Sequence, residues 1–404
     1  KGRNGDESTN VIRNNEATNG GAIYISSEGG CDISVVNISN NKATKMGGGI
    51  YFEGQTSSIE GTGQLVINSA TISNNKSSES GGGIYVANGK FVTGNDISTT
   101  GNPTNIESNR AKDGAGIYVS ERARIELRNI NILGNIATGN GGGLYFAGRS
   151  DISSADDTSK ILSKVTFSDN SSTEFGGNIF LSTGALSIGS EEENAVTING
   201  GSAQNGGGIA TTGTGKLTIL NNVLIQSNTA NENGAGLYVA SSNITTISGS
   251  KTQIGGINGT DKLGNKATNG GGGIYFCKGT LNLGAGIKIS YNEAKNGGGL
   301  YVYGEKSHRI NATGVILSNN IATSVGGGLF VSGAKIDLNS STITDNVAGA
   351  GYGSEIYQGG GLIVLTDGAT ISNSDEILKL KGISLNATMT AKSNGQSFYS
   401  NVLD

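Results

Sequence analysis

A short glycine-rich stretch recurs along the whole chain: three glycines, an aliphatic residue, a tyrosine and another apolar residue. Literal copies of this stretch occupy 47–52, 81–86, 141–146, 271–276 and 297–302. With looser copies there are twelve, which we mark by the aliphatic residue: Ile23, Ile50, Ile84, Ile117, Leu144, Ile179, Ile209, Leu237, Ile274, Leu300, Leu329 and Ile356. The markers are 26 to 37 residues apart. A period in this range is typical of a solenoid, in which each repeat forms one structural unit.

The composition fits an ordered repeat better than a disordered chain. Among 404 residues there are 69 Gly, 1 Pro and no Trp, and a chain this rich in glycine and polar residues is a candidate for disorder. Disordered chains lack periodic aliphatic residues, however, and this chain has them in every repeat. Because solenoid repeats contact only their neighbours, we expect one continuous β-helix over 1–404, as a segment of a longer protein.

Each repeat contains three short runs of β-forming residues, as in 50–52, 64–68 and 70–73. Clusters of Asn, Gly and Ser separate these runs, and no helical period is present. The turns are too short for helical crossovers, so each coil must rise onto the one before it. The sequence therefore predicts an all-β fold, a right-handed single-stranded parallel β-helix of about twelve coils.

Alternation along the strands assigns the side chains to two faces, because residues two apart in a strand share a face. The marker residue and the residue two positions after it are predicted to point into the core. An Asn-x-Ala pattern precedes the glycines, as in 41–43, 109–111 and 292–294. Asn favours turns, and Asn side chains stacked coil on coil can form a ladder of hydrogen bonds.

Between the two inward positions lies an aromatic column that contains nine of the 13 tyrosines. Two interpretations stay open: a stacked ladder that stiffens the sheet, or a contact stripe for a partner protein or glycan. Under the second interpretation the partner-binding candidates are Tyr51, Tyr85, Tyr118, Tyr145, Tyr238, Tyr275 and Tyr301. Extra length is expected at one corner, directly after the tyrosine strand, at 55–63, 88–105, 148–160 and 241–260. Such stacked insertions are a further candidate binding face.

Two tetrapeptides give the chain a family resemblance. Gly20-Gly21-Ala22-Ile23 is a Gly-Gly-Ala-Ile motif, and Phe-x-x-Asn occurs at 167–170 and 398–401. Their alternation resembles the chlamydial polymorphic membrane proteins and similar autotransporter passengers of the pectin-lyase-like β-helix superfamily. The resemblance implies an extracellular, adhesive protein at a bacterial cell surface.

The sequence shows no recognisable set of catalytic residues. Glycoside hydrolysis needs paired carboxylates, and the densest acids, at 156–157 and 191–193, lie in predicted turns or insertions. The one histidine, His308, is followed by Arg309 and is expected to be a solvated surface residue. We predict no catalytic residue, cofactor or metal site.

Partners are constrained by charge, hydropathy and cysteine placement. The chain has 28 Lys and Arg against 32 Asp and Glu, so nucleic acid is not an expected partner. The longest apolar runs, such as 362–365, are too short to span a bilayer. Cys31 and Cys277 are eight repeats apart, roughly 40 Å along a β-helix, so they are predicted not to pair with each other. An intermolecular bridge through Cys31 stays open.

These observations favour a non-enzymatic, adhesin-like or structural passenger segment that binds a host-cell or neighbouring-cell protein or glycan. One alternative is a self-assembling extracellular filament whose subunits stack through their coil ends. The other is a carbohydrate-active β-helix enzyme, a polysaccharide lyase or hydrolase.

Overall fold

A computed structural model describes residues 10–27, 29–55, 63–94, 101–149, 158–190, 195–349, 352–366, 368–372, 388–390 and 396–400. The described residues form β-strands, turns and bends, with no helix among them. The chain divides into two compact units, Lys1–Thr197 and Ile198–Asp404. Each unit is treated by itself below, and the expectation of one continuous domain stays a prediction.

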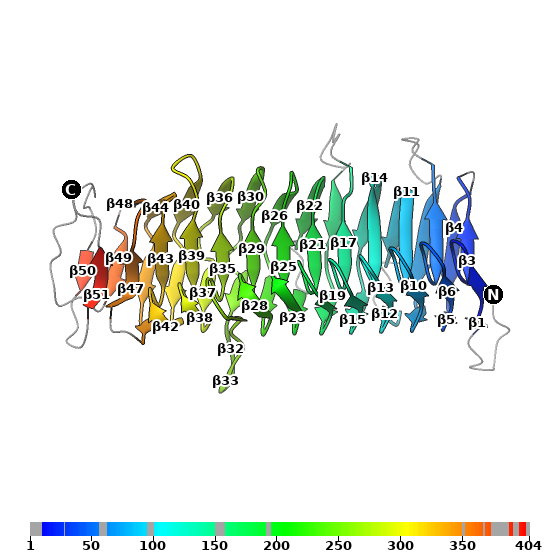
Figure 1. Cartoon of the computed structure of the whole chain (residues 1–404), viewed down its shortest axis with the longest axis horizontal. Coiled ribbons are helices and arrows are strands. Elements are labelled where there is room, and N and C mark those ends of the chain that lie inside the picture. The colour runs from blue at the N-terminus through cyan, green and yellow to red at the C-terminus, as the bar shows by residue number, and fades with distance from the viewer. Residues whose placement is uncertain are drawn as a thin grey trace. The chain divides into compact units, whose positions relative to one another are not determined.

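Unit 1, Lys1–Thr197, is built of short strands, and the strands of successive coils stack to form three parallel sheets, which we name A, B and C (Figure 1). Sheet A contains β1 (Asn10–Arg13), β5 (Val36–Ser39), β9 (Thr71–Ser73), β12 (Thr104–Glu107), β15 (Ile130–Leu133) and β19 (Val165–Ser168). Sheet B contains β2 (Glu16–Ala17), β6 (Lys42–Ala43), β10 (Lys76–Ser77), β13 (Arg110–Ala111), β16 (Ile136–Ala137) and β20 (Ser171–Ser172). Sheet C contains β3 (Ile23–Ile25), β4 (Cys31–Ser34), β7 (Ile50–Glu53), β8 (Gln64–Asn68), β11 (Ile84–Thr93), β14 (Ile117–Leu127), β17 (Leu144–Phe146), β18 (Ser159–Ile161), β21 (Ile179–Leu181) and β22 (Ala185–Ile188).

Unit 2, Ile198–Asp404, repeats the same plan, and β23 (Val196–Asn199) straddles the division. Its sheet A strands are β27 (Val223–Gln226), β31 (Gln253–Gly255), β37 (Lys288–Ser290), β41 (Ile316–Ser318), β45 (Thr342–Thr344), β49 (Thr370–Ser372) and β50 (Thr388–Thr390). Its sheet B strands are β24 (Ser202–Asn205), β28 (Thr229–Asn233), β34 (Lys266–Ala267), β38 (Glu293–Asn296), β42 (Ile321–Val325) and β46 (Val347–Ala348). Its sheet C strands are β25 (Ile209–Thr211), β26 (Lys216–Ile219), β29 (Leu237–Val239), β30 (Ile244–Ile247), β35 (Ile274–Phe276), β36 (Thr280–Leu283), β39 (Leu300–Tyr303), β40 (Arg309–Thr313), β43 (Leu329–Ser332), β44 (Lys335–Asn339), β47 (Tyr352–Gln358), β48 (Leu362–Thr366) and β51 (Gln396–Ser400).

The strands of successive coils pair in parallel and in the register that the repeat predicts. Ile50 lies opposite Ile23 and Ile84, and in unit 2 Ile274 lies opposite Leu237 and Leu300. Every marker residue from Ile50 to Ile356 is fully buried, as is the residue two positions after most of them, whereas Ile23 is half-buried. The predicted parallel β-helix, with like residues stacked on like in its core, is confirmed.

A ladder of buried asparagines runs through each unit at the turn between sheets A and B. Asn75 donates from its backbone N and its Nδ2 to Oδ1 of Asn109, at 2.9 and 3.1 Å. Its Nδ2 also donates to the carbonyl oxygen of Ile38 at 2.9 Å. In unit 2, Asn265 donates to Oδ1 of Asn292 in the same way, at 3.0 and 2.9 Å. The ladder therefore satisfies backbone groups that the turn leaves without strand partners.

Each position of the triplet requires glycine for a different physical reason, as Gly47, Gly48 and Gly49 show. Gly47 has a φ of +68°, which favours glycine. A Cβ on Gly48 would lie 2.4 Å from the carbonyl oxygen of Gly82, and a Cβ on Gly49 would lie 3.3 Å from Nδ2 of Asn75. The third glycine thus leaves room for the ladder asparagine.

Three repeats lack glycine at this third position, where they carry Ala22, Asn178 and Glu355, and the last two of these side chains accept from a ladder asparagine. Asn178 accepts from Nδ2 of Asn170 at 2.8 Å in unit 1. Glu355, a fully buried carboxylate, accepts from Nδ2 of Asn346 at 2.5 Å in unit 2. At these two positions a side chain in place of glycine therefore serves as the acceptor for the ladder asparagine of its own repeat.

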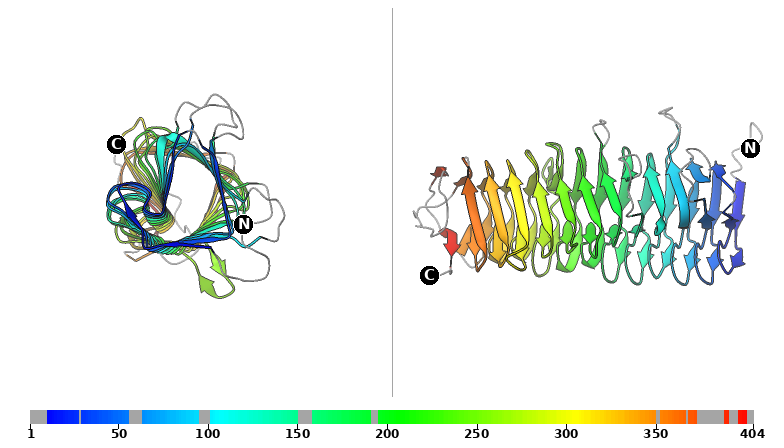
Figure 2. Two further views of the ribbon diagram at one scale, coloured as in Figure 1. Left: turned by 90° about the vertical axis from the view of Figure 1, so that its right-hand side faces the viewer. Right: turned by 90° about the horizontal axis from the view of Figure 1, so that it is seen from above.

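The expectation that 241–260 extends the corner after the tyrosine strand was wrong. In that repeat the extra length follows β31 and forms a small antiparallel hairpin, β32 (Ile257–Asn258) with β33 (Asp261–Lys262). The hairpin projects from its coil in Figure 2, and its residues are exposed. The expected insertion at 88–105 is also partly strand, because β11 continues to Thr93. Much of the other two, at 56–62 and 150–157, lies outside the described residues.

Candidate functional site

The outward residue after each marker forms a column of stacked rings in unit 1. Strand pairing places Tyr51 opposite Tyr24 and Tyr85, because the register is preserved from coil to coil. The ring centroids from Tyr24 through Tyr51, Tyr85 and Tyr118 to Tyr145 are 5.0, 5.2, 5.1 and 4.6 Å apart. The interplanar angles along this stack are between 4° and 20°. Phe180 then contacts Tyr145 edge to face, at 5.0 Å and 70°.

Unit 2 has an equivalent column. Tyr238, Tyr275, Tyr301, Phe330 and Tyr357 stack with centroids 5.4, 5.0, 4.5 and 5.3 Å apart. The structure thus brings together all seven candidates predicted from the sequence, four in unit 1 and three in unit 2. We call these two rows the tyrosine columns.

The tyrosine columns present ring edges rather than ring faces. Each inner ring lies between two others, and those from Tyr51 to Tyr145 and from Tyr238 to Tyr301 are half-buried. The turn before the glycine triplet of the preceding coil lies against the ring of Tyr301: a Cβ on Gly270 would lie 2.8 Å from Cδ2 of Tyr301. Tyr24, which has a neighbouring ring on one side only, is 51% exposed. A partner therefore meets a row of phenol edges and hydroxyl groups.

The hydroxyl groups of Tyr24, Tyr85, Tyr118 and Tyr275 stay protonated over the physiological range. The Tyr24 hydroxyl donates to Oε2 of Glu53 at 2.7 Å, and this bond, with lesser contributions from burial and charge, raises the pKa of Tyr24 to about 12. Burial, which disfavours the charged phenolate, raises the pKa of Tyr85 to about 12 and that of Tyr118 further. It also raises the pKa of Tyr275. The columns therefore offer neutral hydroxyl groups as donors and acceptors.

Acidic side chains flank the column of unit 1. Glu53, Glu79, Asp113 and Glu121 each add to the rise in pKa of a nearby tyrosine through their negative charge. Glu232 acts in the same way on Tyr238 in unit 2. Carboxylates therefore lie near the tyrosines of the unit 1 column, and one carboxylate lies near Tyr238 in unit 2.

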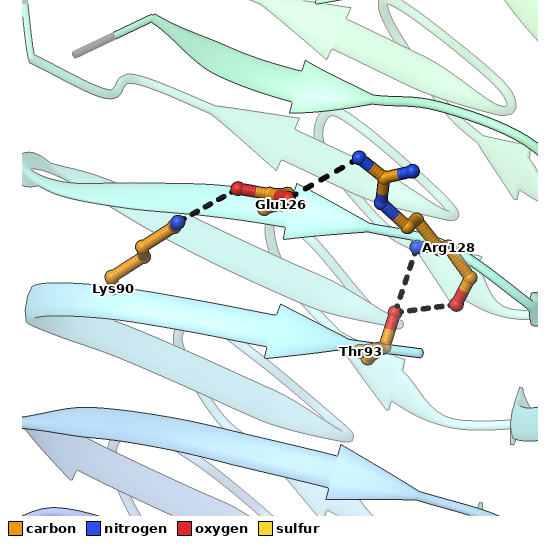
Figure 3. A network of polar contacts seen from close by, with 4 residues as sticks. All are labelled: Lys90, Thr93, Glu126 and Arg128. Atoms are coloured by element: carbon orange, nitrogen blue, oxygen red, sulfur yellow. Dashed lines mark hydrogen bonds and ion pairs between the residues drawn. The ribbon is translucent and has the colours of Figure 1, made fainter. Parts of the chain in front are cut away.

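The charged side chains at the ends of β11 and β14 in sheet C neutralise one another. Lys90 Nζ lies 2.7 Å from Oε2 of Glu126, and Arg128 lies 3.5 Å from its Oε1 (Figure 3). Thr93 Oγ1 donates to the carbonyl oxygen of Arg128 and accepts from its backbone N, at 2.9 and 3.1 Å. Burial alone would raise the pKa of Glu126, but the hydrogen bond from Lys90 and the nearby cations lower it. This network holds β11 and β14 together on the surface of unit 1.

The structure describes few groups suited to metal or acid–base chemistry. His308 is half-buried rather than solvated, and its Nδ1 is buried and has no hydrogen-bond partner among the described residues. In the described residues, no three His, Cys, Asp or Glu side chains come together to hold a metal ion. The acids at 156–157 and 191–193 lie outside the described part. Both cysteines, Cys31 and Cys277, are free thiols.

Comparison with protein families gives two matches, at residues 35–53 and 69–87. Each match runs from a sheet A strand through the asparagine ladder and a sheet B strand to the glycine triplet and the tyrosine strand. Both are to the Chlamydia polymorphic membrane protein repeat. The resemblance stated above is therefore confirmed. This polymorphic membrane protein repeat favours the outer membrane or cell surface as the location of the chain.

The other comparisons add no relative. The searches of curated proteins and of solved structures gave no match. No helix capable of crossing a bilayer was found in the part of the chain that the structure describes.

Sequence reasoning missed one surface feature, a row of cations on sheet B of unit 1. The signal was present: the residue between the ladder asparagine and the following small residue is Lys42, Lys76 and Arg110 in three successive repeats. The register of β6, β10 and β13 places these three side chains in one column. We call it the basic column.

Proposed function

We propose that this chain is a non-enzymatic, adhesin-like segment at a bacterial cell surface. Its tyrosine columns would attach it to a protein or glycan on a host or neighbouring cell. The observation that carries the proposal is the order of these columns, in which one outward position keeps an aromatic ring through five or more successive coils. The repeat match adds support for a surface location.

The physical chemistry of the columns suits binding. Tyrosine is enriched among the residues that contribute most to interfaces, because it offers a large contact area and has few rotatable bonds. Stacking already restricts these rings, so the tyrosine side chains lose little additional entropy when a partner binds. Repetition along the coils also allows several weak contacts to act together.

A catalytic role has less support in the described residues. A cavity of about 430 Å³ in unit 2 is lined by Lys306, Lys335, Leu362 and small residues, with no carboxylate in its lining. Hydrolysis of a glycosidic bond by the usual route needs two carboxyl groups that face the same substrate. We therefore propose binding rather than turnover.

The test is binding of the fluorescently labelled full chain to cultured epithelial cells. Replacing Tyr85, Tyr118 and Tyr145 together with serine removes three adjacent rings from the column of unit 1. We expect about a hundredfold loss of binding, since three interface tyrosines that contribute on the order of 1 kcal/mol each amount to about 3 kcal/mol together.

Two control variants separate binding from stability. Tyr303→Ser removes a tyrosine that is 51% exposed and lies outside the columns, so it should bind like the wild type. A variant with phenylalanine at Tyr85, Tyr118 and Tyr145, the triple phenylalanine variant, keeps the stack and removes only the hydroxyl groups. Its binding should lie between that of the wild type and that of the triple serine variant. Wild-type binding by the triple serine variant, with an unchanged circular dichroism spectrum, would refute the proposal.

A further inference from the structure

The basic column is a row of like charges on adjacent strands. Lys76 lies directly opposite Lys42 on one side and Arg110 on the other, at a strand spacing of about 4.8 Å. All three side chains are exposed. Like charges directly opposite each other destabilise a sheet, so the fold itself gives no reason for this arrangement.

Most of this charge is uncompensated among the described residues. Lys42 forms an ion pair with Glu16 at 2.7 Å at the N-terminal end of the column. Neither Lys76 nor Arg110 has an ion pair in the described part of unit 1. This differs from the Lys90–Glu126–Arg128 network on sheet C, where an acid lies between the cations.

Hydrogen-bonding side chains border the basic column on both sides. Asn40 and Asn74, at the turn that precedes sheet B, are exposed and have positive φ. Thr44 and Ser78 form the next outward position, which Lys112 continues as a fourth exposed cation. The strip is therefore cationic along its centre and carries amide and hydroxyl groups at its borders.

We propose that the basic column binds a linear anionic polysaccharide that carries sulfate or carboxylate groups. Its chain would lie across the strands β6, β10 and β13, roughly perpendicular to them. Successive cations then meet successive anionic groups, because a sugar unit in an extended polysaccharide is comparable in length with one strand spacing. The amide and hydroxyl side chains at the borders hydrogen-bond to sugar hydroxyl groups.

A polysaccharide fits this strip better than a nucleic acid. Proteins that bind single-stranded nucleic acid use aromatic side chains on which bases stack. The two outward positions of β6, β10 and β13 and their borders carry none. The tyrosines of unit 1 lie in sheet C, where their faces are already stacked on one another.

The experiment measures binding of the full chain to heparin, a sulfated polysaccharide, by surface plasmon resonance at several salt concentrations. Lys76→Gln with Arg110→Gln removes the two cations without an ion pair. We expect the dissociation constant at about 0.1 M salt to rise about tenfold, since each exposed charge contact contributes up to about 1 kcal/mol. The dependence on salt should also become less steep, because fewer counterions are released.

Three controls make the test specific. Lys76→Arg with Arg110→Lys keeps both charges and should bind like the wild type. Lys266→Gln removes a cation in the equivalent column of unit 2, where Glu293 already neutralises it at 2.9 Å, and should also leave binding unchanged. Neutral dextran should not bind.

The proposal is overturned by any of three results. They are no heparin binding at low salt, equal weakening by Lys266→Gln, and tighter binding of single-stranded DNA than of heparin. Because Lys76 and Arg110 lie on sheet B and the triple serine substitutions lie on sheet C, loss of heparin binding and loss of tyrosine-dependent cell binding are distinguishable.

Discussion

The interiors of the two units are built in the same way, but the units differ on one outer face. In both, an asparagine ladder fills the turn between sheets A and B, and aromatic rings stack on the outside of sheet C. On sheet B, however, the outward column of unit 1 includes Lys42, Lys76 and Arg110, whereas that of unit 2 has Lys266 paired with Glu293. It then continues with Ile321 and Val347, which are exposed.

This difference separates positions that the fold constrains from positions that it leaves free. A core side chain in a β-helix contacts its counterparts above and below, so a change at one coil disturbs its neighbours. An outward side chain on sheet B lies in water, where the fold accepts Lys, Thr, Ile or Val alike. A run of like charge at such a position therefore points to a partner rather than to folding.

The largest loss of stability is expected from substitutions in the core of either unit. Ile84→Asp in unit 1 and Ile274→Asp in unit 2 each place a charge in a fully buried stack. Each should lower the free energy of unfolding by more than about 4 kcal/mol, because the charge has no partner there. Thermal and urea denaturation measure this loss. Ile257→Asp, on the exposed hairpin, is the control, and an unchanged melting temperature for either core variant would contradict the inward assignment.

The asparagine ladders should also respond alike in both units. Asn109→Ala removes the oxygen that accepts from the backbone N and Nδ2 of Asn75. Asn292→Ala does the same to Asn265. We expect a loss of about 3 kcal/mol for each, because buried donors are left without acceptors. Urea denaturation distinguishes this result from the small change expected for Thr44→Ala, an exposed position on sheet B.

The ends of the ladders sharpen the comparison, because each uses a different acceptor. Asn178→Gly and Glu355→Gly restore the usual third glycine but remove the group that accepts from Asn170 or from Asn346. We expect losses of about 1–3 kcal/mol, with the larger loss for Glu355 because a carboxylate oxygen accepts a stronger hydrogen bond than an amide oxygen does. Equal stability of the glycine variants and the wild type would show that these two acceptors do not stabilise the ladders.

The tyrosine columns predict a loss of stability in alkali. Because the pKa of folded Tyr85 is about 12 against an ordinary value of 10.0, the folded state holds its proton over a range in which the unfolded state releases it. Stability is therefore complete below pH 10 and falls as the pH rises from there toward 12. Melting temperatures between pH 8 and 12 test this. The decline should be smaller in the triple phenylalanine variant, and an equal decline would assign it to other groups.

The sequence predicted the fold well because a repeat samples each structural position many times. Ile84, Val86 and Tyr85 are interpretable together because eleven other repeats carry similar residues in the same order. The parallel pairing, the buried stacks and the ring column follow from that register. The hairpin at 257–262 occurs in one repeat only, so no pattern indicated its corner.

The candidate site was predicted in its residues but not in its exposure. Alternation places Tyr85 and Tyr118 outward, but only the structure shows that neighbouring rings cover their faces and leave their ring edges accessible. The basic column was missed because Lys42 and Lys76 belong to a pattern that was interpreted only through its inward asparagines. His308 was expected in water, but its local turn buries Nδ1, which no repeat could indicate.

The most direct measurement compares cell binding by two triple variants, one in each unit. Tyr85, Tyr118 and Tyr145 are replaced with serine in the first variant, and Tyr238, Tyr275 and Tyr301 in the second. Since the two columns have the same stacking geometry, binding to epithelial cells should fall in both variants, while each keeps the wild-type spectrum by circular dichroism. If both folded variants bind cells as tightly as the wild type, the tyrosine columns only stiffen the sheets, and the proposed function is wrong.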